Sequence, residues 1–229
     1  MLRVLLLIAL ALPLPAMAQL RWLEGKHYIR LPVPQTAESR PGKIEVAEVF
    51  SYGCIHCYRA QADVAKLKTA LPADAYMAYV HASFAPAEAW PMYQRAWYAA
   101  QTLGIGEAHH QQMFSAVWET GEVLLLDKST NRVRKPLPTL QEAARFYARV
   151  AKVKEADFMK TASSPGVDAL VKRADQLVAA WRIGGTPSFV VNGRYLINNE
   201  VVSGWSDMQS VIVFLVGQER QRMKATAKP

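Results

Sequence analysis

Two cysteines, Cys54 and Cys57, are the only thiols in the 229-residue chain, and they lie three positions apart in the segment SYGCIHCYRA. Such a pair could form a structural disulfide, supply two ligands to a metal, attach a haem, or act as a dithiol that is oxidised and reduced in turn. Which chemistry applies depends on the compartment, on the element that carries the pair, and on residues that reach it from elsewhere in the chain.

The neighbouring residues argue against three of these uses. A c-type haem site has histidine directly after the second cysteine, where this chain has Tyr58. A structural zinc site needs four ligands, for which the candidates are Cys54, His56, Cys57 and His81. A structural disulfide would close a very small ring and constrain little of the unfolded chain. A redox-active dithiol is the favoured interpretation, and the zinc site and the structural disulfide stay open as alternatives.

The elements around the pair support a redox role. Residues 44–50 form an apolar, β-branched run that predicts a strand buried on both faces. Residues 54–69 then take a helical spacing, and residues 76–81 predict a second strand. At a helix start, unpaired backbone N–H groups and the helix dipole favour a thiolate. We therefore expect Cys54 to be the ionised thiol and Cys57, one turn inward, to be shielded.

Two other side chains could assist the cysteines. His56 would be a donor near the Cys54 sulfur and, when protonated, a cation beside it, although it could also be a simple exposed polar residue. Glu48 lies in an otherwise apolar strand. If it points into the core behind the helix, its pKa would be raised and it could exchange a proton with Cys57. The alternation of strand faces leaves an outward orientation open.

The remainder of the chain predicts a helical block and a return to strands. Residues 86–182 are rich in Ala, Gln, Trp and Met, and glycines and prolines divide them into several helices, the last capped at Ser164-Pro165. Residues 188–197 predict a hairpin with a tight Asn-Gly turn, and residues 206–220 a closing helix followed by a frayed basic tail.

The first residues have the pattern of an export signal. Residues 1–18 combine Arg3, an apolar run and Ala16-Met17-Ala18, so we expect cleavage before Gln19. The alternative, a retained membrane anchor, usually needs about 20 apolar residues. The net charge of +8 favours solubility and does not establish nucleic-acid binding, which we do not expect.

Several motifs together carry a resemblance to a known family. They are Glu48-x-x-Ser51-x-x-Cys54-x-His56-Cys57-Tyr58, His81-Ala82-Ser83-Phe84, Ala96-Trp97, Leu103-Gly104, Gly185-Thr186-Pro187 and Phe189-Val190-Val191-Asn192-Gly193. With these residues the chain resembles the DsbA-type thiol:disulfide oxidoreductases of the bacterial periplasm, from Gln19 to the last helix. The resemblance implies an α/β, thioredoxin-like fold with a large helical insertion. The thioredoxin-like domain would comprise residues 19–85 and 183–229, and the insertion residues 86–182.

The resemblance also implies a mechanism. Cys54 would be the nucleophile, Cys57 the resolving thiol, Glu48 the buried acid, and Pro187 a cis proline packed over the cysteines. The protein would pass its disulfide to unfolded or folding exported proteins and be reoxidised by a quinone-linked membrane partner of the DsbB type. It would act as a monomer in the periplasm, with no metal and no cofactor other than the Cys54-Cys57 disulfide.

Three residues depart from the usual family pattern. Ile55 replaces a common proline, Thr186 replaces a frequent valine before the cis proline, and Tyr79 stands where some members have a lysine near the buried acid. Thr186 and Ile55 are the candidate substrate-contacting residues, so these departures concern redox poise and partner preference. A disulfide isomerase or reductase, and a chaperone-like peptide-binding module, are the alternative functions.

Overall fold

A five-stranded mixed sheet lies at the centre of the fold. The computed structural model describes residues 21–202 and 204–226, so the predicted export signal lies outside the described residues. The strand order is β1-β5-β4-β2-β3. The strands are β1 (Tyr28–Arg30), β2 (Ile44–Phe50), β3 (Ala75–His81), β4 (Ser188–Val191) and β5 (Tyr195–Ile197). The central strand β2 pairs in parallel with β3 and antiparallel with β4, which confirms the predicted β-α-β unit.

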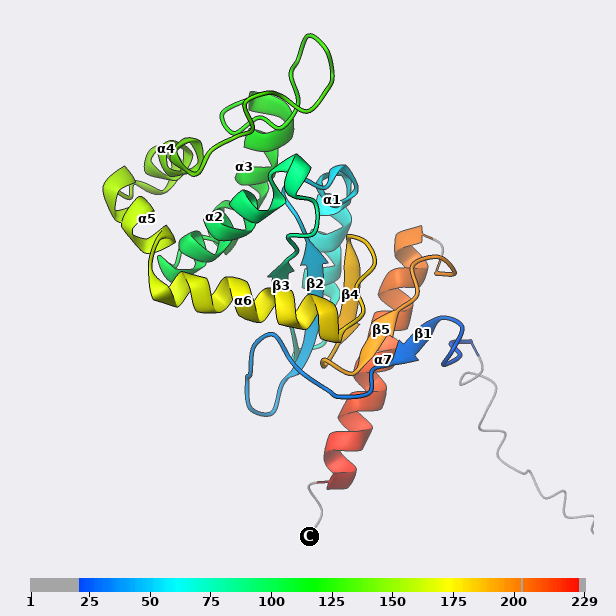
Figure 1. The fold of residues 1–229 in the computed structure, drawn as a ribbon. Helices are drawn as coiled ribbons and strands as arrows, with labels where there is room; N and C mark the ends of the chain where they lie inside the picture. The colour runs from blue at the N-terminus through cyan, green and yellow to red at the C-terminus, as the bar shows by residue number, and fades with distance from the viewer. Residues whose placement is uncertain (1–20, 203, 227–229) are drawn as a thin grey trace, which may run out of the picture.

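Helices cover both faces of this sheet and extend beyond one end of it (Figure 1). The helices are α1 (Ile55–Ala70), α2 (Trp90–Thr102), α3 (His110–Ser115), α4 (Leu140–Ala151), α5 (Glu155–Ala162), α6 (Pro165–Ala180) and α7 (Gly204–Thr226). Short 3-10 turns at Pro86–Glu88 and Glu107–His109 and a π-helical turn at Ala116–Thr120 connect members of the block. No helix among the described residues is long and apolar enough to cross a bilayer.

The central strand is buried on both faces, as its composition predicts. All seven residues of β2 are buried. Ile44 and Val46 pack in a core with residues of α1 and α7, whereas Ala47 and Val49 pack in a core with residues of α6 and the helical block. This double coverage explains why the strand has no regular alternation of apolar and polar residues.

The hairpin after the helical block has the predicted turn. Asn192 and Gly193 both have positive φ, 50° and 58°, which the tight Asn-Gly turn requires. Gly193 is also needed for packing, because a Cβ there would lie 2.0 Å from the carbonyl oxygen of Gln35. The chain before β2 thus packs on the hairpin. Strand β1, which the sequence did not indicate, pairs with β5.

The last helix is longer than predicted. It begins at Gly204 and ends at Thr226, so the expected frayed segment after residue 220 is helical as far as Thr226. The buried carboxylate of Glu219 accepts hydrogen bonds from Arg222, and the Thr226 hydroxyl donates to backbone carbonyls of the last turns. These hydrogen bonds stabilise the last turns of the helix. The sequence analysis missed them because it treated these side chains only as polar residues.

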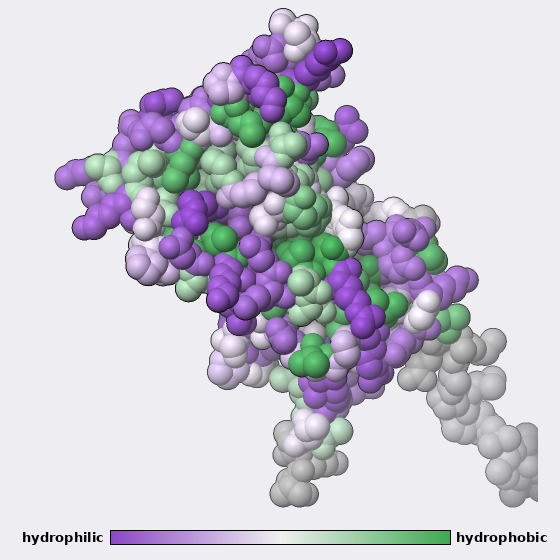
Figure 2. Space-filling view, in the orientation of Figure 1, coloured by the Kyte–Doolittle hydropathy of each residue, from purple (hydrophilic) through white to green (hydrophobic). Residues whose placement is uncertain are grey.

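Polar side chains cover most of the surface seen in Figure 2, and apolar side chains gather in the middle of that face, around the upper ends of β2 and β4. Cys54 and Cys57 follow shortly after this end of β2.

Candidate active site

The two cysteines lie at the junction between β2 and α1. Cys54 has an extended backbone and is the N-cap of α1, so the helix begins one residue later than predicted. Its sulfur accepts a hydrogen bond from the backbone N–H of Cys57 at 3.2 Å. Both cysteines are free thiols, and Cys54 is 6% exposed whereas Cys57 is completely buried. Only the first sulfur is therefore open to an incoming thiol.

The surroundings of Cys54 favour its thiolate. Its pKa is lowered from 9.0 to about 6, first by a hydrogen bond from the Cys57 side chain and then by one from the Thr186 side chain. The backbone N–H groups of Cys57 and His56 add to this effect, while burial opposes it. Hydrogen bonds to the charged form outweigh the loss of solvation, as expected for a sulfur at a helix start.

Thr186 reaches Cys54 from the other side of the site. The Thr186-Pro187 bond is cis, as the family resemblance implies. In the thiol form the Cys54 sulfur donates to the backbone carbonyl of Thr186 at 3.4 Å. The Thr186 hydroxyl is buried and has no other partner among the described residues. When Cys54 ionises, the carbonyl loses its donor and the hydroxyl can donate to the sulfur instead.

Cys57 and Glu48 form an acidic pair behind Cys54. Burial raises the pKa of Cys57 well above its usual value, and the charges of Cys54 and Glu48 raise it further. Glu48 is fully buried, which settles its orientation in favour of the core. Burial, and to a lesser extent the charge of Cys54, raises its pKa from 4.5 to about 8. A neutral carboxyl near a neutral thiol can hold or release a proton at physiological pH.

A buried histidine fixes the turn before Cys54, a role that the sequence did not reveal. His81 accepts a hydrogen bond from the backbone N–H of Tyr52 through Nε2 at 3.1 Å and donates from Nδ1 to the carbonyl of Ala82 at 2.8 Å. Both ring nitrogens are thus occupied. His81 thus bonds the active-site turn, and the described residues contain no group of three or more His, Cys, Asp or Glu side chains that could hold a metal ion.

The other predicted residues differ in exposure. The His56 side chain is exposed, and its backbone N–H, rather than its imidazole, acts on the pKa of Cys54. Ile55 is half-buried beside the cysteines. Tyr79 is the cross-strand neighbour of Glu48, and burial raises the pKa of its hydroxyl. The Tyr79 side chain itself is uncharged, and the Lys68 ammonium lies 5.7 Å from the centroid of its ring.

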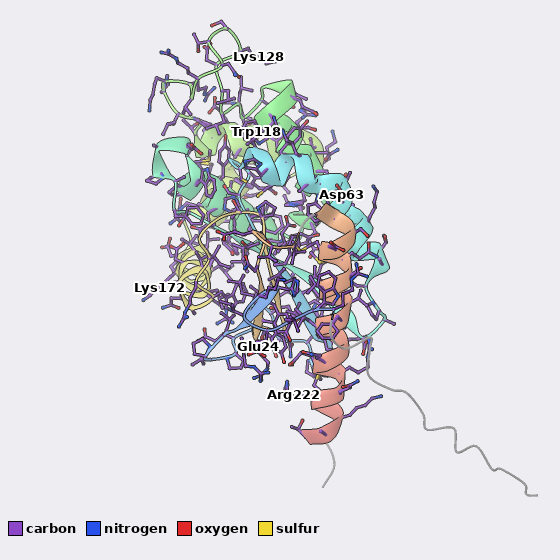
Figure 3. The ribbon with its side chains drawn as sticks, turned by 90° about the vertical axis from the view of Figure 1, so that its right-hand side faces the viewer. Glu24, Asp63, Trp118, Lys128, Lys172 and Arg222 are labelled. Carbon is purple, nitrogen blue, oxygen red and sulfur yellow. The ribbon has the colours of Figure 1, made fainter. Side chains whose placement is uncertain are left out.

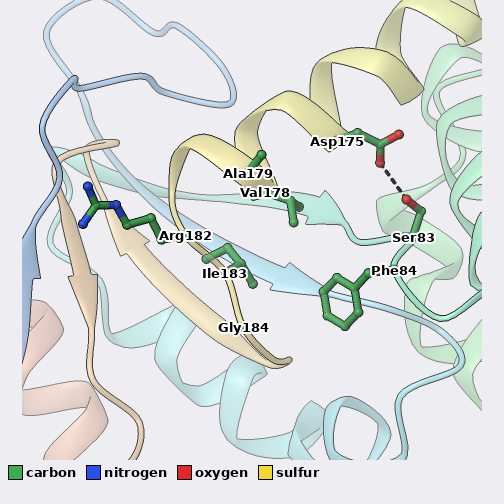
Figure 4. A pocket seen from close by; sticks show the side chains of 8 residues that line it. All are labelled: Ser83, Phe84, Asp175, Val178, Ala179, Arg182, Ile183 and Gly184. Atoms are coloured by element: carbon green, nitrogen blue, oxygen red, sulfur yellow. Dashed lines mark hydrogen bonds between the residues drawn. The ribbon is translucent and has the colours of Figure 1, made fainter.

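Two cavities flank the exposed ring of Phe84. The larger, about 550 Å³, lies between the end of α6 and the segment after β3, and Phe84 projects into it in Figure 4. There Ser83 donates a hydrogen bond to Asp175 at 2.7 Å. The smaller cavity, about 300 Å³, is lined by Cys54 itself. Chemistry at the sulfur therefore takes place in the smaller cavity.

Trp118 joins the helical block to the active-site turn. Figure 3 shows it at the level of α1, and its indole N–H donates to the carbonyl of Tyr52 at 2.8 Å. Its ring stacks on Tyr58 of α1, with centroids 6.1 Å apart and an interplanar angle of 20°. The helical insertion thus contacts the active site directly.

Comparison with known proteins agrees with this geometry. The chain is 31% identical over 196 residues to the thiol:disulfide interchange protein DsbA of Azotobacter vinelandii, covering 86% of this chain and 84% of that protein. The chain belongs to the DsbA family. It is therefore a protein thiol:disulfide oxidoreductase, a disulfide oxidase that uses a thioredoxin-like fold with a helical insertion.

Other DsbA proteins show the same similarity. DsbA of Pseudomonas aeruginosa is 29% identical over 200 residues, which cover 87% of each chain. The crystal structure of DsbA from Xylella fastidiosa has a TM-score of 0.74 at 30% identity, over 86% of this chain and 97% of that one. The crystal structure of Pseudomonas aeruginosa DsbA gives 0.73 at 28% identity, over 89% and 97%. No family model matches the chain.

Proposed function

We propose that this DsbA protein oxidises unfolded or folding exported proteins in the periplasm, through residues with distinct roles at Cys54 and Cys57. A substrate thiolate attacks the Cys54 sulfur of the oxidised protein, breaking the Cys54-Cys57 bond and forming a mixed disulfide. A second substrate thiolate then attacks the substrate sulfur of that bond. The substrate leaves with a disulfide, and the protein keeps two electrons as the reduced pair.

The observation that carries this assignment is the opposite direction of the two thiol pKa values. The pKa of Cys54 is lowered to about 6, so its thiolate is a good leaving group when the mixed disulfide is resolved. The pKa of Cys57 is raised, so it ends the cycle as a neutral thiol. Stabilising the reduced form in this way makes the protein a stronger oxidant, so transfer of its disulfide to a substrate is favoured.

Glu48 has the position of a proton carrier for Cys57 in this proposal. It is a buried carboxyl with no hydrogen-bond partner among the described residues, and its charge raises the pKa of Cys57, which supports this role. Cys57 must lose a proton when the disulfide is restored. Because the pKa of Glu48 is about 8, its carboxyl first releases its own proton to solvent, and the carboxylate then accepts the Cys57 proton. Thr186 and Ile55 border the substrate, Pro187 lies over the cysteines, and the backbone N–H of His56 stabilises the Cys54 thiolate.

The cycle requires an electron acceptor and a compartment. We propose that a quinone-linked membrane protein of the DsbB type restores the disulfide, and that the protein acts as a monomer without metal or nucleic acid. We also propose that residues 86–182 form the insertion. All strands of the described residues lie outside that range, which supports this division.

Equilibration of the purified protein with glutathione buffers tests the direction of transfer. We expect the protein to be more oxidising than thioredoxin, and to form disulfides in a reduced, unfolded protein. A reduction potential as low as that of thioredoxin, about −270 mV, would support the reductase alternative instead. If a variant lacking both cysteines retained full activity, the chaperone-like alternative would replace the proposal.

A further inference from the structure

The loop between the π-helical turn and α4, residues 121–139, projects from the helical insertion and is called the insertion loop below. It reaches beyond the other elements, at the end of the fold opposite the C-terminus of α7 (Figure 1). Figure 3 labels Lys128 at this end and Arg222 at the other. Val133 of the loop lines the cavity beside Cys54, so the loop lies at the active-site end of the molecule.

Basic residues are concentrated in and around the insertion loop. Residues 119–154 contain eight of the chain's 27 basic side chains but only four of its 19 acidic ones. Lys128, Arg132 and Lys135 are exposed, and none of them forms an ion pair among the described residues. Three cations of one short segment thus face solvent without an acidic partner.

The last turns of α7, at the opposite end of the molecule, have a different arrangement of charge. Arg220 there pairs with Asp74 at 2.5 Å, and Arg222 pairs with the buried carboxylate of Glu219 at 2.8 Å. The positive charge of these arginines is therefore offset by neighbours, whereas that of the insertion loop is available to a partner.

The one acidic residue at the tip of the loop serves to order the tip. One carboxylate oxygen of Asp127 accepts hydrogen bonds from the backbone N–H groups and hydroxyls of Ser129 and Thr130, at 2.5 to 3.0 Å. The backbone N–H of Asp127 donates to the carbonyl of Arg132 at 2.8 Å. All the side-chain contacts of Asp127 are thus with neutral donors of the tip, and none is with a neighbouring cation.

The base of the loop is also held in place. Leu126 and Val133 form a β-bridge, and Arg134 binds both carboxylate oxygens of Glu142, each at 2.6 Å. A loop that is ordered before it meets a partner loses little conformational entropy on binding. The three exposed cations are therefore presented in a fixed arrangement.

The shape of the loop favours a surface over a small ligand. Neither of the two cavities described above is lined by Lys128, Arg132 or Lys135. A small molecule needs a concave pocket, which a projecting tip does not supply. An anionic bilayer needs none, and each Lys or Arg close to it raises binding about fivefold.

The proposed reoxidising partner spans a membrane, so a membrane surface is within reach of an exported protein that it reoxidises. We propose that the insertion loop binds anionic phospholipid headgroups through Lys128, Arg132 and Lys135, and so holds the active-site end of the molecule toward the membrane. The binding depends on the loop alone. Its benefit, a shorter search for the membrane partner, rests on the proposed function.

Flotation with lipid vesicles tests the binding. The exported form of the protein is mixed with vesicles of phosphatidylcholine alone or of phosphatidylcholine with phosphatidylglycerol, and the fraction that floats with the lipid gives a partition coefficient. With three unpaired cations, we expect the partition coefficient to be roughly 100-fold larger for the anionic vesicles at low salt. The difference should shrink as salt is added, because exposed charges are screened.

Two triple variants with the same change in net charge locate the binding. The loop variant Lys128→Gln, Arg132→Gln, Lys135→Gln should lose nearly all preference for anionic vesicles. Its rate of exchange with dithiothreitol should equal that of the wild type, which shows that the fold and the active site are intact. The control variant Lys26→Gln, Lys172→Gln, Lys224→Gln removes three exposed lysines elsewhere and should keep most of the preference; Figure 3 shows Lys172 well away from Lys128.

Two results would overturn the inference. In one, the wild-type protein partitions equally into neutral and anionic vesicles; if it then bound soluble polyglutamate and the loop variant did not, the partner of the loop would be an acidic polypeptide. In the other, the two triple variants lose the preference equally, which would make it an effect of net charge. A protein that binds anionic vesicles through the loop but oxidises no peptide would instead contradict the proposed function.

Discussion

Replacing Glu48 with glutamine should change how the stability of the protein depends on pH. Glu48 is fully buried on the central strand, and neither carboxylate oxygen has a hydrogen-bond partner among the described residues. Burial first, and the charge of Cys54 second, raises its pKa from 4.5 to about 8. Glutamine has nearly the same shape and cannot titrate, so Glu48→Gln removes the titration and keeps the packing.

The sign follows from proton binding. Between pH 4.5 and about 8 the folded protein holds the Glu48 proton and the unfolded chain has released it. Stability falls with rising pH wherever the folded state binds more protons. The slope for one proton is about 1.4 kcal/mol per pH unit. Summed from 4.5 to pH 7, the penalty on the wild-type protein reaches about 3 kcal/mol, and it is almost absent at pH 4.5.

Two buried histidines change the stability with pH in the opposite direction, so their contribution must be separated from that of Glu48. Burial lowers the pKa of His81 and of His110 from 6.5 to about 3, so each adds a slope of opposite sign below pH 6.5. Both residues are present in wild type and variant. The difference between the two unfolding free energies therefore isolates Glu48, whereas the wild-type curve alone does not.

Urea unfolding of the reduced proteins at pH 5, 6, 7 and 8 measures that difference. We expect the variant to gain about 1.4 kcal/mol on the wild type for each pH unit up to about 7, whatever constant offset the buried amide introduces. Glu45→Gln is the matched control, because Glu45 is equally buried on the same strand but accepts hydrogen bonds from Ala37, Glu38 and Tyr76. Burial also raises the pKa of Glu45, but these hydrogen bonds oppose the rise, so its difference from the wild type should change less with pH. That variant should be less stable than the wild type. A Glu48→Gln difference that does not change with pH would refute the reasoning.

Three further predictions concern the cysteines. Cys57→Ala should accumulate mixed disulfides through Cys54, and Cys54→Ala almost none; mass spectrometry that found adducts mainly on Cys57 would reverse the assignment. Thr186→Val should raise the Cys54 pKa above about 6, because the hydroxyl that lowers it is gone, and titration of the thiolate absorbance would show no shift if that bond is unimportant. The lowered Cys54 pKa gives the reduced protein extra stability that is complete above 9.0, about 4 kcal/mol, and is lost as pH falls through about 6. In urea unfolding at pH 8, the reduced protein should therefore have a larger unfolding free energy than the oxidised one. This difference should become smaller at lower pH, and a difference that stays constant would contradict the prediction.

Local patterns were enough to predict the path of the chain around the cysteines. The apolar run at 44–50 predicted a doubly buried strand, and Asn192-Gly193 predicted the hairpin turn, because these depend on a few adjacent residues. The Ser164 cap followed by Pro165 predicted the start of α6 for the same reason. Errors occurred at helix ends, such as Thr226, where contacts with other turns decide how far a helix continues.

Side-chain environments were harder to predict, because they depend on residues that are distant in sequence. His81 was a candidate metal ligand by residue type, but its hydrogen bonds to Tyr52 and Ala82 make it a clamp on the active-site turn. Arg134 pairs with Glu142, a contact that the sequence analysis did not predict. Glu142 belongs to a capping box, and Arg134 lies eight positions before it. This spacing also occurs among ordinary surface charges, so it is a weak signal for a salt bridge.

The sequence alone determined the chemistry of this protein: two thiols at a strand-to-helix junction, a nearby acid and a Thr-Pro segment, in the pattern of the DsbA family. Only the tertiary structure decided how that chemistry is controlled. It buries Glu48 without a hydrogen-bond partner among the described residues, brings Thr186 to Cys54 across 132 positions of sequence, and places the insertion loop at the reactive sulfur. The physical reason is that a pKa and a binding pocket depend on desolvation and on neighbours in space, and neither is a property of a short stretch of residues.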